Sequence, residues 1–178
     1  MLGISLQDVK IMMTPDGMAN FIISQIQGMT DPGAANNAFY SALCTYVEAN
    51  MDVTYAWTGA LTSPPFTKDP MTVLSCKVKT SGTLTPSGAT NPGDALSMFS
   101  AILNQNAALW TVIWPVGFTL TPAFIIPTIT ITPSGATDMN SAWLAVATQI
   151  IAGLKSATPA ATGSHASFVG AAAFSEIS

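Results

Sequence analysis

The sequence predicts an α+β protein that is mainly helical, with four or five helices, a small antiparallel β element and an extended proline-rich apolar arm. Two observations carry this prediction. Apolar residues recur at helical spacing in several long segments, and the period changes to two in the region that follows the second of them. The 178 residues suit a single domain, 1–178, which is long enough to bury a core.

The helical pattern is clearest in two segments. A broad apolar face repeats through 34–51, and a second apolar helix is expected over 138–155. A turn at 14–17 introduces an earlier helix, which Gly28 helps to end. These three helices define most of the predicted core.

The change to a period of two predicts two strands. Val53, Tyr55 and Trp57 alternate with small or polar residues, and a similar alternation runs through 72–79. The proline-rich stretch 63–70 between them is expected to be loop. The two strands can therefore form a hairpin with a long connection.

An internal repeat is the most specific feature of the chain. The motif T-L-T-P-S-G-A-T-N opens the unit 83–105, and T-I-T-P-S-G-A-T-D opens the unit 130–154, 47 residues later. Each copy leads through a turn to a capping residue, Asn91 or Asp138, ahead of an apolar helix. The matched helix positions are Ala95 with Ala142, Leu96 with Trp143, Phe99 with Val146, and Leu103 with Ile150. We interpret the copies as two equivalent units that share one core.

Two apolar segments suggest contacts with other subunits. The prolines of 108–129 argue against a central strand, so this segment is predicted to be an extended arm covered by the fold or by a neighbour. The small residues of 158–163 indicate a linker within a C-terminal docking tail, 158–178, that ends in a short helix. Aromatic residues here are expected to be core or interface anchors. The candidate interface residues are Trp110, Trp114, Phe118, Phe124, Phe168, Phe174 and Ile177.

The charge content predicts association. Charged residues make up 8% of the chain, whereas about 25% is typical of soluble domains. A surface with so little charge is poorly protected against association, so copies of this chain and other structural subunits are the expected partners. The chain has no arginine and a formal net charge of −4, which disfavours nucleic acid as a partner.

Candidate chemistry is sparse, and neither an enzyme, a cofactor, a metal site nor a small-molecule substrate is expected. His165 lacks a G-x-S-x-G partner motif and is interpreted as a solvated or capping residue. Cys44 and Cys76 are expected to be small buried side chains, although a disulfide between them stays open. Glu48 and Asp52 are one helical turn apart, but the chain is predicted to leave the helix between them.

Two other classes of protein stay open as alternatives. The uncharged stretch 95–137 allows a membrane-associated or pore-forming protein, although four prolines would interrupt a spanning helix. The N-terminus lacks the basic start and apolar run of a signal peptide. A small hydrolase that uses His165 is the third reading.

The sequence resembles the small structural proteins of tailed-bacteriophage virions, such as tail, neck or baseplate subunits. The resemblance is carried by the duplicated T-x-T-P-S-G-A-T-[ND] motif, the apolar segments 110–127 and 168–177, the absence of arginine and the Ala/Ser/Thr/Pro-rich composition. It is a likeness of composition and organisation. It implies a ring or collar subunit of the virion, made in the host cytoplasm, and assigns no functional residue.

Overall fold

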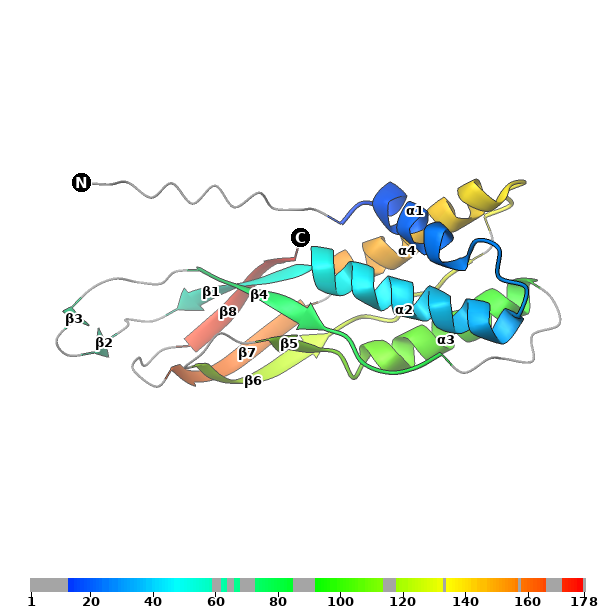
Figure 1. Ribbon diagram of the computed structural model, residues 1–178. Helices are drawn as coiled ribbons and strands as arrows, with labels where there is room; N and C mark the ends of the chain where they lie inside the picture. Colours follow the sequence, from blue (N-terminus) through cyan, green and yellow to red (C-terminus); the bar gives the residue numbers. More distant parts are fainter. Residues whose placement is uncertain are drawn as a thin grey trace.

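The computed structural model describes residues 13–58, 62–63, 66–67, 73–84, 92–113, 118–132, 134–156, 158–165 and 171–177. The fold is α+β and mainly helical, as predicted, with four helices and a small antiparallel sheet in the described part of the chain. The helices gather at one end of the molecule and the strands at the other (Figure 1).

The four described helices are α1 (Pro15–Ile26), α2 (Pro32–Asn50), α3 (Pro92–Ala107) and α4 (Met139–Lys155). Capping side chains precede α1, α2 and α4, whereas Asn91, the predicted cap of α3, lies outside the described residues. The Asp31 carboxylate accepts a hydrogen bond from the backbone N–H of Ala34 at 2.6 Å. Asp138 accepts one from the N–H of Ser141 at 2.9 Å. The predicted helices 34–51 and 138–155 are therefore confirmed, with boundaries shifted by at most two residues.

The largest sheet has four strands in the order β5-β4-β1-β8. Strands β1 (Asp52–Thr58) and β4 (Val73–Lys79) pair antiparallel, which confirms the predicted hairpin. The connection between them, predicted to be loop, contains a small ribbon of β2 (Thr62–Ser63) and β3 (Phe66–Thr67).

The predicted arm 108–129 is extended, but it pairs with other strands of its own chain. Strand β5 (Thr111–Ile113) adds to β4, and β6 (Phe118–Ile125) pairs antiparallel with β7 (Thr158–His165). Pro122 of β6 lies opposite Ala161 of β7. Among the described strands β6 pairs with β7 alone, and an edge strand is where proline is tolerated. The sequence predicts an arm covered by the fold or by a neighbour, and the pairing observed here is with strands of the same chain.

The predicted linker 158–163 and the short final helix are both wrong. The first lies in β7, and the end of the chain forms β8 (Ala171–Ile177), which pairs antiparallel with β1. These segments are rich in Ala, Thr, Ser and Gly and carry little apolar periodicity. Pairing with an existing strand satisfies their backbone groups and so decides their conformation.

A segment without regular structure follows β6 and leads to α4. The side-chain amide of Asn104 donates to the carbonyl oxygen of Ile129 at 2.9 Å, and its oxygen accepts from the Ile129 N–H at 2.7 Å. The Ser100 hydroxyl donates to the same carbonyl. Gly153 of α4 lies so close that an added Cβ would be 2.5 Å from Cγ1 of Ile129. The two repeat-unit helices are thereby held against the same buried residue.

Candidate functional site

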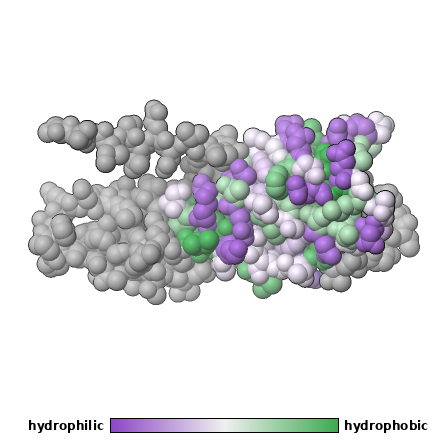
Figure 2. Space-filling model, viewed as in Figure 1, coloured by the Kyte–Doolittle hydropathy of each residue, from purple (hydrophilic) through white to green (hydrophobic). Residues whose placement is uncertain are grey.

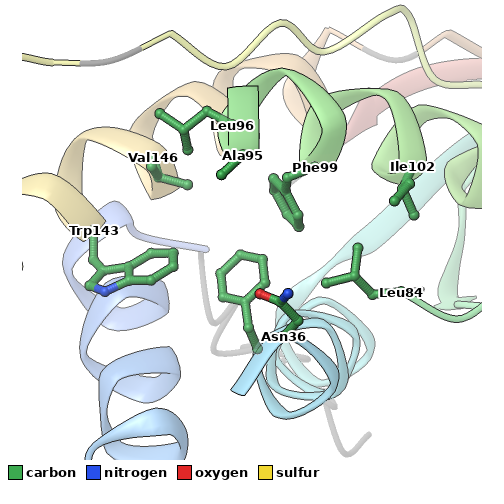
Figure 3. A pocket seen from close by; sticks show the side chains of 9 residues that line it. Asn36, Leu84, Ala95, Leu96, Phe99, Ile102, Trp143 and Val146 are labelled. Atoms are coloured by element: carbon green, nitrogen blue, oxygen red, sulfur yellow. The ribbon is translucent and has the colours of Figure 1, made fainter. Parts of the chain in front are cut away.

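An apolar pocket opens between α2, α3 and α4 and has a volume of about 130 Å³ (Figure 3). Phe99 projects into it from α3, and Trp143 enters from α4 on the opposite side. Its lining residues are Asn36, Phe39, Leu84, Ala95, Leu96, Phe99, Ile102, Trp143 and Val146. We call this space the aromatic pocket.

Three aromatic rings form the wall of the aromatic pocket. The ring of Phe39 lies 4.6 Å from that of Phe99, in an edge-to-face arrangement with an interplanar angle of 70°. It lies 4.9 Å from the ring of Trp143 at 31°. Such offset and edge-on contacts favour ordered ring positions, so the wall has a defined shape.

The two repeat units meet at this pocket. Helices α3 and α4 begin at equivalent positions of the repeat, Pro92 and Met139. Two matched pairs, Leu96 with Trp143 and Phe99 with Val146, line the aromatic pocket. A second groove beside the pocket is lined by two matched pairs, Ala95 with Ala142 and Leu96 with Trp143. Its other lining residues are Thr132, Ser134, Gly135, Ala136 and Val146. The repeat register was the sequence signal for this site, but it does not reveal that the two helices face each other.

Asn36 is the polar residue of the aromatic pocket. Its amide is half-buried and makes no hydrogen bond within the part of the chain that the structure describes. The other eight lining residues are apolar. The pocket therefore combines an apolar, largely aromatic lining with one side-chain amide that can form hydrogen bonds.

A second, polar groove lies between α2 and the segment that follows β4. The Tyr40 hydroxyl donates to the carbonyl oxygen of Ser81 at 2.9 Å, and burial raises its pKa. Burial also raises the pKa of the Cys44 thiol in the same groove. A raised thiol pKa is the opposite of what a nucleophile needs, because the thiolate is the reactive form. In this groove the Tyr40 hydrogen bond holds α2 against the segment that follows β4.

The two acids considered as a pair, Glu48 and Asp52, are each bound to a different lysine. The Nζ atom of Lys77 lies 2.7 Å from Oδ1 of Asp52, and that of Lys79 lies 3.2 Å from Oε1 of Glu48. Glu48 also accepts hydrogen bonds from the N–H and hydroxyl of Thr80. Each carboxylate is therefore paired with a lysine of its own.

The cysteines are free thiols, and the second of them is also unsuited to catalysis. Cys76 is buried in β4, and burial together with the nearby Asp52 carboxylate raises its pKa to about 11. His165 ends β7 with its backbone opposite Phe118. The described residues contain no cluster of three His, Cys, Asp or Glu side chains that could hold a metal ion.

The predicted interface residues fall into three groups. Trp110 is only 3% exposed, and its indole N–H donates to the carbonyl oxygen of Ser81 at 3.2 Å. It therefore belongs to the core of the chain itself, which corrects its expected role as an interface anchor. The backbones of Phe118 and Phe124 lie in β6, and those of Phe174 and Ile177 in β8. Trp114 and Phe168 lie outside the described residues.

The neighbours of Trp110 in sequence form an exposed apolar edge that the sequence reasoning missed. Leu109 is 60% exposed and Ile113 is 53% exposed, whereas Trp110 and Val112 are buried. This alternation follows the period of strand β5, which is an outer strand of the four-stranded sheet. We call Leu109, Thr111 and Ile113 the β5 edge.

The remaining large exposed apolar side chains are on helices or next to them. Figure 2 shows apolar residues interspersed among polar ones on the face of the helical body in view. The exposed residues in this group are Met29, Met98 and Met139. Every described helix falls short of the length and apolar character that a membrane span requires.

Comparison with protein-family models, curated proteins and solved structures finds no match to this chain.

Proposed function

We propose that the chain is a non-catalytic structural subunit that assembles with copies of itself and with other structural proteins. The resemblance in composition and organisation supports a tailed-phage virion as the assembly, with the chain as a tail, neck or baseplate component. The observation that carries the proposal is the β5 edge, where Ile113 is exposed on an outer strand of the four-stranded sheet and Leu109 is exposed in the turn that precedes this strand.

An outer strand presents unpaired backbone groups and is a template for pairing with another chain. Natural monomers often protect such strands with charged residues, especially lysine. Here the two lysines on the adjacent strand, Lys77 and Lys79, are both engaged in ion pairs within the chain. The low overall charge of 8% adds little further protection. The β5 edge is therefore well suited to contact a neighbouring subunit.

The test is the native mass of the detergent-free protein, measured by light scattering. We expect a large oligomer for the wild type and a much smaller species for the double variant Leu109→Lys/Ile113→Lys. Met139→Lys is the matched control, because Met139 is also 60% exposed but lies at the start of α4. A monomeric wild type at tens of micromolar would refute assembly of the chain with copies of itself.

The lysine substitutions change exposed side chains, whereas Trp110→Ala or deletion of 168–178 would disturb the fold itself. Trp110→Ala would open the core, and removing a buried aromatic side chain typically costs about 3–5 kcal/mol. Deleting 168–178 would remove β8 and expose β1 as a new edge. Electron microscopy of the wild-type oligomer then tests the virion assignment: rings or tubes support it, and a closed dimer contradicts it.

A further inference from the structure

The aromatic pocket is unrelated to the β5 edge and has the features of a ligand site. Its lining combines buried Phe39, Leu84 and Val146 with half-buried Phe99 and Trp143. The view in Figure 3 shows these side chains converging on one space from different elements. The pocket is thus formed by α2, α3, α4 and Leu84, which are distant from one another in sequence.

The size of the pocket limits what it can hold. A cavity of about 150 Å³ lined by Leu, Ile and Phe is known to stay dry and to bind benzene. The aromatic pocket has a similar volume of about 130 Å³. It can therefore accommodate one six-membered ring, which would lie beside Phe99 and Trp143 in the arrangements that aromatic rings favour.

The chemistry of the lining limits the ligand further. No lining residue is charged, so an ionised ligand would lose its hydration without a compensating partner. Asn36 offers one amide that can both donate and accept a hydrogen bond, and it has no partner among the described residues. The pocket therefore suits a neutral ligand with one polar group.

We propose that the aromatic pocket binds one small neutral aromatic molecule that carries a single hydroxyl or amino group. The ring lies against the aromatic wall of Phe39, Phe99 and Trp143, and the polar group hydrogen-bonds to the amide of Asn36. This assignment stands independently of the proposed assembly function.

Phenol and benzene are the probes that test this proposal, with binding to the full chain measured by calorimetry and by ligand-observed NMR. For ligands of this size we expect saturable one-to-one binding with a Kd of about 0.1–5 mM. Asn36→Ala should weaken phenol about fivefold and leave benzene unchanged, because only phenol uses the amide. Ala95→Trp should abolish binding of both, since Ala95 is an exposed lining residue whose enlargement blocks the space.

Circular dichroism and the melting temperature establish that both variants fold like the wild type. If Ala95→Trp does not fold, Leu96→Trp on the same helix replaces it. Absence of saturable binding to the wild type, or unchanged affinity in the blocked variant, would overturn the proposal. A fall in native mass on adding phenol would place a side chain of a neighbouring subunit in the pocket and would overturn the small-molecule assignment.

Discussion

Replacing Asn104 by alanine should destabilise the fold, because its side chain fixes the segment around Ile129. Both polar atoms of the Asn104 side chain are bonded to the backbone of Ile129, at 2.7 and 2.9 Å, and Ile129 is buried. In Asn104→Ala the carbonyl of Ile129 keeps the Ser100 hydroxyl, but its N–H loses its partner. An unsatisfied buried donor costs about 1–3 kcal/mol.

The helix propensity of alanine offsets part of this loss, by about 0.5 kcal/mol. We therefore expect a net decrease of about 0.5–2.5 kcal/mol in the free energy of unfolding. The assay is urea denaturation followed by far-UV circular dichroism, at one fixed protein concentration because association would change the apparent stability. Asn37→Ala is the control, since Asn37 is an exposed residue of α2. Equal stabilities of the two variants would refute the claim that Asn104 holds this segment.

Three further changes probe a helix cap, the close approach of Gly153 to Ile129 and an ion pair. Asp31→Ala should lower the free energy of unfolding by about 1 kcal/mol, because α2 loses its capping side chain. Asp31→Asn should lower it much less, because asparagine can still cap the helix. Equal losses for the two variants in urea denaturation would contradict this. Gly153→Ala should destabilise by about 1 kcal/mol, since overpacking against Ile129 exceeds the helix-propensity gain; a more stable variant would show that the contact yields. Partial burial raises the pKa of Glu48, but hydrogen bonds from Thr80 and the adjacent lysine outweigh it and lower the net pKa. Its contribution to stability is therefore present above the unfolded-state pKa and is lost as the pH falls through the folded-state pKa. Below about pH 5 the free energy of unfolding of Glu48→Gln should accordingly decrease less steeply with falling pH than that of the wild type.

The helices could be predicted because their signals are local. A capping aspartate followed by an apolar stripe marks the starts of α2 and α4, and the hairpin follows from the alternation in β1 and β4. These signals need only a few neighbouring residues. They are therefore visible in the sequence without any knowledge of the fold.

The end of the chain could not be predicted in the same way. Strand β8 contains the run Ala171–Ala173 and pairs with β1, which lies more than a hundred residues earlier. Its conformation depends on the presence of that distant strand, and small residues give no period of their own. Trp110 was misassigned for a related reason. Its burial depends on contacts that only the folded chain makes, among them the hydrogen bond to the carbonyl of Ser81.

The size of the aromatic pocket argues that it has an occupant. At about 24 cal/mol per Å³, a closed void of 130 Å³ would cost about 3 kcal/mol, and the open pocket costs some part of this. A larger aliphatic residue in place of Val146 would remove much of the space without introducing a polar group. We therefore expect Val146→Leu to raise the free energy of unfolding of the ligand-free protein and to weaken phenol binding. A variant less stable than the wild type would mean that the surrounding side chains already fill the pocket in solution.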